Sequence, residues 1–146
     1  MEYENDFIMR QVRDMVRMLA KVLFGKNTAT YDYHEEYLHE NSLDDGDGEE
    51  NQTESNRKRA KLLAADRLYS QLIKMVDAGE INKAENLLSD ELDQDEDEYF
   101  EAALGFYDYL NTLSDEFLEE HDYSREEVKD GAQSLAERKG LGGLGE

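Results

Sequence analysis

The side chains best suited to bind a cation are three aspartates at alternate positions, Asp93, Asp95 and Asp97. This spacing supplies the first, third and fifth ligands of a calcium-binding loop. The same pattern requires a glycine at its sixth position and a glutamate at its twelfth, where this chain has Glu98 and Leu104. We therefore expect no metal site. We interpret the run as the acidic first turn of a helix, which the helix dipole favours.

Histidine, serine and glycine motifs are also incomplete. His34 and His39 are five residues apart, whereas two zinc ligands on one helix face need a spacing of four. Ser55 and Lys58 form a Ser-x-x-Lys pair without its companion motifs, so we interpret Ser55 as a helix cap. Residues 140–145 match a dinucleotide-binding glycine pattern, but that pattern works only between a strand and a helix. The sequence therefore predicts no catalytic residue and no cofactor, and we expect a protein that is not an enzyme.

The balance of charges restricts the classes of partner. The chain has 146 residues, with 37 acidic and 16 basic side chains and a formal net charge of −21. Such a charge repels nucleic acid and anionic lipid, so we expect no direct nucleic-acid binding. The absence of cysteine excludes disulfides and thiolate chemistry. No apolar run approaches the roughly 20 residues that span a bilayer, and no signal-peptide pattern is present. We therefore expect a soluble cytoplasmic protein.

Charge and apolar patterns divide the chain into four parts. Residues 5–24 predict an amphipathic helix, because their apolar side chains recur at steps of three and four. Residues 27–56 contain many acids and no Lys or Arg, and they predict a flexible linker. Residues 57–138 predict a helical bundle, and residues 139–146 a glycine-rich tail. Without any strand pattern, we expect one all-α domain over residues 1–146, a compact bundle of five to six helices.

Capping residues mark the later helices of the bundle. After the N-terminal helix, helices are expected at about residues 54–78, 81–92, 93–113, 115–121 and 125–138. Ser114 and Ser124 are predicted N-caps, and Glu127 completes a capping box with Ser124. The basic run at residues 57–61 opposes the dipole of a helix that begins there. Either that first turn frays or the helix begins earlier in the chain.

The segment from residue 68 to 92 resembles one tetratricopeptide-type helical hairpin. Residues 79–81 match the glycine-containing turn of that motif, and Ala84 matches its small contact residue. The match is partial, because Gln71 replaces a leucine, Glu91 replaces a second alanine and no proline closes the repeat. A single repeat is also too short to form a solenoid. The resemblance implies a hairpin of two antiparallel helices.

Three further blocks carry a broader resemblance, at residues 5–10, 79–88 and 107–127. In their order along the chain they are similar to a family of small uncharacterised all-helical proteins, a domain of unknown function found mainly in anaerobic Gram-positive bacteria. The resemblance implies an all-helical fold and no known activity.

A row of aromatic residues supplies the candidate contact site. The row wraps more than one helical face, and one stripe of it is expected in the core. Either Tyr109, or the pair Phe100 and Tyr107, is then available as an exposed contact for a protein partner. The alternative is a wide buried face.

These observations favour a non-catalytic protein–protein interaction or scaffold module, whose partner the sequence does not name. One alternative is an acidic mimic of a phosphate backbone that sequesters a basic nucleic-acid-binding protein. Another is peripheral membrane association through residues 6–24, although we favour packing of this helix within the domain. A homodimer formed through the same helix is compatible with each hypothesis.

Overall fold

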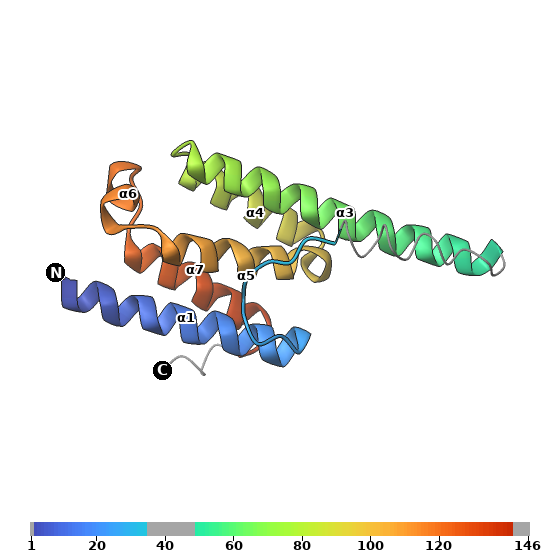
Figure 1. Ribbon diagram of the computed structural model, residues 1–146, viewed down its shortest axis with the longest axis horizontal. Coiled ribbons are helices and arrows are strands. Elements are labelled where there is room, and N and C mark those ends of the chain that lie inside the picture. The colour runs from blue at the N-terminus through green and yellow to red at the C-terminus, as the bar shows by residue number, and fades with distance from the viewer. Residues whose placement is uncertain (1, 35–48, 142–146) are drawn as a thin grey trace.

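The computed structural model describes residues 2–34 and 49–141, and every regular element in these ranges is a helix (Figure 1). The helices are α1 (Glu2–Phe24), α3 (Glu49–Asp77), α4 (Ile81–Gln94), α5 (Glu96–Thr112), α6 (Asp115–Glu120) and α7 (Arg125–Arg138). The all-α fold expected from the sequence is therefore confirmed.

Helix α5 lies at the centre of the bundle and contacts α1, α3, α4 and α7. Its buried residues are Phe100, Ala102, Ala103, Leu104, Gly105, Phe106, Tyr107, Leu110 and Asn111. A helix that is apolar around most of its circumference must be covered on most sides, and the four neighbouring helices provide that cover.

Helix α1 packs its apolar stripe against α5 and α7. The stripe consists of Val12, Met15, Val16, Leu19 and Ala20, which are all buried. Their spacing of three and four residues places them on one face of the helix, and the basic residues between them remain outside. The helix expected from residue 5 begins earlier, at Glu2.

The α3–α4 hairpin turns at Gly79, which has a φ of +85°. The amide of Gly79 donates to the Val76 carbonyl at 2.9 Å, and the amide of Glu80 donates to the Met75 carbonyl at 2.8 Å. A Cβ at Gly79 would also lie 2.6 Å from the imidazole ring of His121. Glycine is therefore required here both for the backbone conformation and for the close approach of the ring.

The predicted linker over residues 27–56 must be corrected where the structure describes it. Residues 49–56 belong to α3, so the helix begins before the basic run at residues 57–61, and that run no longer opposes the dipole at a helix start. Ser55 consequently lies inside α3 and is not a cap. The remaining prediction for residues 35–48 falls outside the described residues, as does the predicted tail for residues 142–146.

The two predicted serine caps are confirmed. The Ser114 hydroxyl accepts a hydrogen bond from the Phe117 amide at the start of α6, and Ser124 forms a full capping box with Glu127 at the start of α7. These short-range signals are reliable because all the participating groups lie within four residues of one another.

Arg125 anchors the end of α5 and the start of α6 to α7. It is only 5% exposed, and its guanidinium donates to the Asp115 carboxylate at 2.7 and 2.9 Å. It also donates to the carbonyls of Asn111 at 3.0 Å and Leu113 at 2.6 Å. Burial opposes ionisation of Asp115, but hydrogen bonds from Arg125 and Asn5 outweigh it and lower the pKa of this carboxyl. The buried cation is thus paired and fully surrounded by acceptors.

A second, partly buried polar cluster joins α4, α5 and Tyr123, the residue before Ser124. The hydroxyls of Tyr107 and Tyr123 both donate to one carboxylate oxygen of Glu85, at 2.9 and 2.8 Å. Burial, reinforced by the Glu85 charge, raises the pKa of both tyrosines. A Cβ at Gly131 would overlap the Tyr107 ring, so this glycine allows α7 to approach α5 closely.

Candidate functional site

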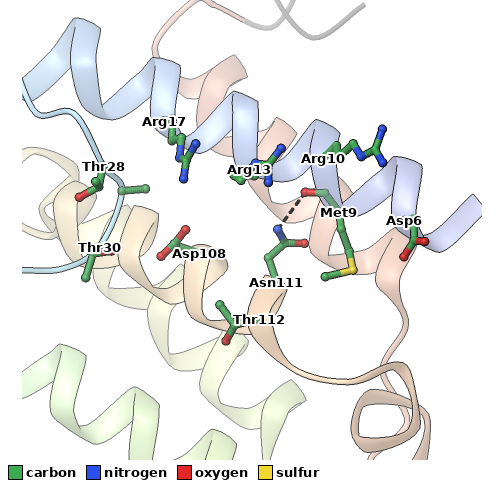
Figure 2. A pocket seen from close by; sticks show the side chains of 11 residues that line it. Asp6, Met9, Arg10, Arg13, Arg17, Thr28, Thr30, Asp108, Asn111 and Thr112 are labelled. Atoms are coloured by element: carbon green, nitrogen blue, oxygen red, sulfur yellow. Dashed lines mark hydrogen bonds between the residues drawn. The ribbon is translucent and has the colours of Figure 1, made fainter.

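A groove of about 530 Å³ lies between α1 and α5, and residues 28–30 border it at one end (Figure 2). Its lining residues from α1 include Arg10, Arg13 and Arg17, and those from α5 include Asp108 and Asn111. Because α1 and α5 are held together by their apolar stripes, the polar flanks of both helices face the same groove. It combines concave shape with charged side chains, and we take it as the candidate site.

The three arginines occupy successive turns on one flank of α1. Residues at steps of three and four lie above one another on a helix, so Arg10, Arg13 and Arg17 form a row about 10 Å long. All three are exposed. Arg13 makes a long contact of 3.8 Å with Asp14, and both of these side chains are largely exposed. In a chain with a net charge of −21, this row is a local concentration of positive charge.

The opposite wall carries a half-buried acid. Asp108 and Arg17 point toward one another across the groove in Figure 2. Burial raises the pKa of Asp108, although the nearby charges of Arg17 and Lys26 act in the opposite direction. Along the same wall, the Asn111 amide donates to the Met9 carbonyl at 2.9 Å and so ties α5 to α1.

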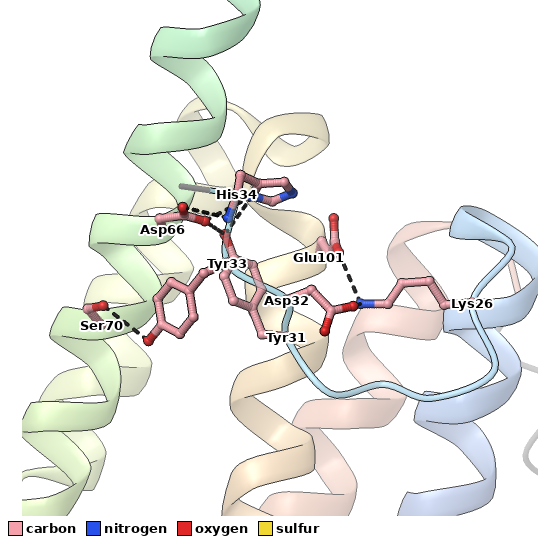
Figure 3. Close-up of polar contacts among 8 residues, drawn as sticks. All are labelled: Lys26, Tyr31, Asp32, Tyr33, His34, Asp66, Ser70 and Glu101. Carbon is pink, nitrogen blue, oxygen red and sulfur yellow. Dashed lines mark hydrogen bonds and ion pairs between the residues drawn. The ribbon is translucent and has the colours of Figure 1, made fainter. Parts of the chain in front are cut away.

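Lys26 holds the border of the groove in place (Figure 3). Its ammonium donates to the Thr30 carbonyl at 2.8 Å and lies 3.1 Å from a Glu101 oxygen and 3.2 Å from an Asp32 oxygen. These contacts connect the end of α1, the following segment and α5. Thr28 and Thr30 are thereby positioned with their side chains beside the groove.

The same segment is fixed to α3 by the buried carboxylate of Asp66, which is 2% exposed (Figure 3). Asp66 accepts hydrogen bonds from the Tyr31 hydroxyl at 2.6 Å and the His34 amide at 2.8 Å, and it lies 2.9 Å from His34 Nδ1. The Tyr31 ring stacks on Tyr69 with a centroid distance of 4.4 Å. A Cβ at Gly105 would lie 2.7 Å from the Tyr31 Cβ, so this glycine lets the segment lie directly on α5.

The aromatic contact residues expected from the sequence do not form one exposed patch. Phe100 is 1% exposed and Tyr107 is 6% exposed, so the expectation that this pair is available to a partner is wrong. Both belong to the wide buried face of α5, because helices cover that face on several sides. Tyr109 is partly buried, and its hydroxyl donates to Asp77 at 2.5 Å. This hydrogen bond, together with burial, raises the pKa of Tyr109 to about 12.

The aspartates of the calcium-like pattern are distributed over two helices and their junction. Asp95 is the N-cap of α5 and accepts a hydrogen bond from the Glu98 amide at 3.2 Å. Asp93 pairs with Arg138 at 2.9 Å, and Asp97 lies 3.3 Å from Lys139. Within residues 2–34 and 49–141, no group of three or more histidines and carboxylates is arranged to hold a metal ion.

The histidines are separated as well. His34 contacts Asp66, His121 packs edge-on against Phe117 at a centroid distance of 4.6 Å, and His39 lies outside the described residues. Each described histidine therefore has a packing or hydrogen-bonding partner of its own.

Sequence reasoning missed the groove. The spacing of the basic residues in the first helix is a usable signal for a positively charged flank. The sequence contains no signal that Asp108, about ninety residues later in the chain, forms the opposite wall of the groove. As for the bilayer, none of the helices in the described parts is at once long enough and apolar enough to cross one.

Comparison with known proteins adds one finding. Neither the curated proteins nor the solved structures include a match to this chain. A family of unknown function, DUF6483, matches residues 2–140, which is almost the whole sequence. The chain therefore belongs to the DUF6483 family.

Proposed function

We propose that the protein is a non-catalytic protein–protein interaction module that binds an acidic segment of a partner protein in the groove between α1 and α5. The observation that carries this proposal is the row formed by Arg10, Arg13 and Arg17 along the groove. A guanidinium group presents a fork of N–H donors that matches a carboxylate, and such charge-assisted pairs are stronger than neutral hydrogen bonds.

The size of the row favours a short peptide segment. An extended chain rises about 3.3 Å per residue, so three or four residues span the distance from Arg10 to Arg17. A nucleic acid would extend beyond the row and meet a surface whose overall charge is −21. A short acidic segment reaches from Arg10 to Arg17 without extending over the rest of that surface.

The two alternative hypotheses have weaker support. Carboxylates at the α4–α5 junction, which an acidic mimic would present, are partly neutralised by Arg138 and Lys139. Membrane association through α1 requires an exposed apolar face, but most of that face packs against α5 and α7. Among the α1 side chains that the structure describes, from residue 5 to residue 24, the large apolar ones left exposed are Phe7 and Val22.

Other parts of the proposal come from the sequence. We propose that the α3–α4 hairpin is tetratricopeptide-like, since Ala84 of α4 is buried and Gly79 forms the turn. We also propose that the module works in the cytoplasm, and that any homodimer forms through the exposed side of α1. The first two points do not affect the groove hypothesis.

The direct test measures binding of fluorescein-labelled hexaglutamate by fluorescence anisotropy at about 50 and 150 mM salt, which brackets physiological screening. Wild type is compared with the combined variant Arg10→Gln, Arg13→Gln and Arg17→Gln. We expect this variant to lose at least about tenfold in affinity, because each charge-assisted hydrogen bond is worth about 1.5–3 kcal/mol. Labelled hexalysine serves as the probe of opposite charge.

The matched control carries Arg57→Gln, Lys58→Gln and Lys61→Gln, which change the net charge equally on an exposed part of α3. We expect hexaglutamate affinity to change by less than about twofold there, because the Debye length is only about 10 Å. If both variants lose affinity equally, binding is nonspecific and the groove hypothesis fails. Tighter binding of inorganic pyrophosphate than of hexaglutamate would instead indicate a phosphate-bearing ligand.

A further inference from the structure

Asp108 lies in the groove opposite the positive row, and its position is unusual for a site that binds carboxylates. It comes from α5, whereas Arg13 and Arg17 come from α1 (Figure 2). Asp108 is partly buried, and it makes no ion pair within 4 Å with any described residue. An anion that enters between the two helices must therefore approach both the guanidinium groups and this carboxyl group.

The groups around Asp108 act on its pKa in opposite directions. Arg10, Arg13 and Arg17 face the same groove from α1, as does Asp6, and Lys26 is near Asp108 in the segment that follows that helix. Lys26 already contacts Glu101 and Asp32, which reduces its influence. From α3, the phenol of Tyr69 is a neutral neighbour, and its pKa is raised to about 12 by burial first and also by the Asp108 charge.

We propose that Asp108 sets the affinity and the pH dependence of the groove, so that an acidic peptide binds together with uptake of one proton at this carboxyl group. The inference rests on the proposed function, because it assumes a ligand that carries carboxylates. When Asp108 is ionised, it repels the incoming carboxylate and competes with it for Arg17. When Asp108 is protonated, the repulsion disappears and its O–H becomes a donor to the ligand.

The direction of the pH effect follows from linkage. Burial raises the pKa of Asp108 in the free protein, and a bound anion raises it further, because a second negative charge disfavours ionisation. The complex therefore holds more protons than the free protein over the intermediate pH range. Affinity for an acidic peptide must then increase as the pH falls through that range.

The test compares wild type with Asp108→Asn, using labelled hexaglutamate between about pH 5.5 and 8, where the probe stays ionised because glutamate has an ordinary pKa of about 4.3. Asparagine keeps the shape of the side chain and removes the charge. At pH 7.5 we expect the variant to bind about three- to tenfold more tightly than wild type. The increase in affinity at low pH should be present in wild type and absent in the variant.

The matched control is Asp90→Asn, which removes one charge from an exposed position on α4, outside the groove. We expect it to bind hexaglutamate within about twofold of wild type and to keep the pH dependence. Circular dichroism melting curves establish that each variant is folded. Asparagine at residue 108 removes a partly buried charge, so its melting temperature should not fall.

Two results would overturn the inference. The first leaves the proposed function standing, and the second removes it as well. If the arginine variant abolishes binding but Asp108→Asn binds no more tightly than wild type or Asp90→Asn, Asp108 does not control the groove and the proposed function stands. If hexaglutamate binds neither wild type nor Asp108→Asn at millimolar concentration, both proposals fail.

Discussion

The two sides of α5 use charged residues in opposite ways. On the side toward α7, Arg125 is sealed within the fold among its partners, and the partly buried Glu85 accepts hydrogen bonds from Tyr107 and Tyr123. On the side toward α1, Arg17 and Asp108 face one another across an open groove. A charge that is buried must be paired to be tolerated, whereas a charge beside a groove is available to a ligand. Substitutions on the sealed side should therefore change stability, and those on the open side should change binding.

Removing Arg125 is expected to have the largest effect. Arg125→Gln leaves the Asp115 carboxylate and two backbone carbonyls without their buried donor, so we expect a loss of about 3–5 kcal/mol in the free energy of unfolding. Urea denaturation followed by circular dichroism measures this loss. Arg13→Gln is the control on the open side and should cost less than about 0.5 kcal/mol. Equal losses would remove the distinction between the two sides.

A smaller loss is expected from Gly131→Ala. The added methyl group overlaps the Tyr107 ring, and the contact between α5 and α7 must open to accept it. Overpacking of this kind costs about 1–3 kcal/mol. The measurement is again the free energy of unfolding, with Ser134→Ala as an exposed control on the same helix. A variant as stable as wild type would show that this side is packed more loosely than described.

The segment that borders the groove can be tested with Tyr31→Phe. This change removes the hydroxyl that donates to Asp66 and leaves the buried carboxylate one hydrogen bond short, at a cost of about 1–2 kcal/mol. Tyr33→Phe is the matched control, since Tyr33 is 50% exposed and its hydroxyl accepts a hydrogen bond from the exposed Ser70 hydroxyl at 3.1 Å. We expect a change below about 0.5 kcal/mol for the control. A larger loss from the control would contradict the assignment of Asp66 as the anchor.

The last prediction concerns the stability of the fold at acidic pH. The pKa of Asp115 is lowered in the folded protein, so its ionised form adds stability above the unfolded-state pKa of about 3.9, and this contribution disappears as the pH falls through the folded-state value. Wild type should therefore be more stable than Asp115→Asn at neutral pH, and the difference should shrink below about pH 4. Thermal melts across this range measure the effect. A difference that stays constant with pH would mean that the charge of Asp115 is unimportant.

Sequence reasoning succeeded where the determining contacts are local. The turn at Gly79 and the caps at Ser114 and Ser124 depend on groups within a few residues, and each was predicted from its neighbours. The all-α class followed from apolar spacing for the same reason.

It failed where the determining contacts join distant segments. The number of helices that surround α5 decides whether Phe100 and Tyr107 are exposed, and no local pattern contains that number. The segment after α1 was predicted to be flexible because residues 27–56 contain many acids and no Lys or Arg, yet Asp66 and Gly105 provide the contacts that hold Tyr31. Sequence reasoning missed the wall opposite the arginines for the same reason, because that wall belongs to a distant segment of the chain.

The position of α1 also has a consequence for synthesis on the ribosome. Its apolar stripe packs against α5 and α7, which are the third-last and last helices along the described chain. The stretch from Phe24 to Arg138 takes about 6–23 s to translate at typical rates. Until Thr112 is translated, the first helix has neither α5 nor α7 to pack against and exposes Val12, Val16 and Leu19 to its surroundings, and α7 is absent until the end of this interval. This helix is therefore the part of the nascent chain with the longest exposure to chaperones.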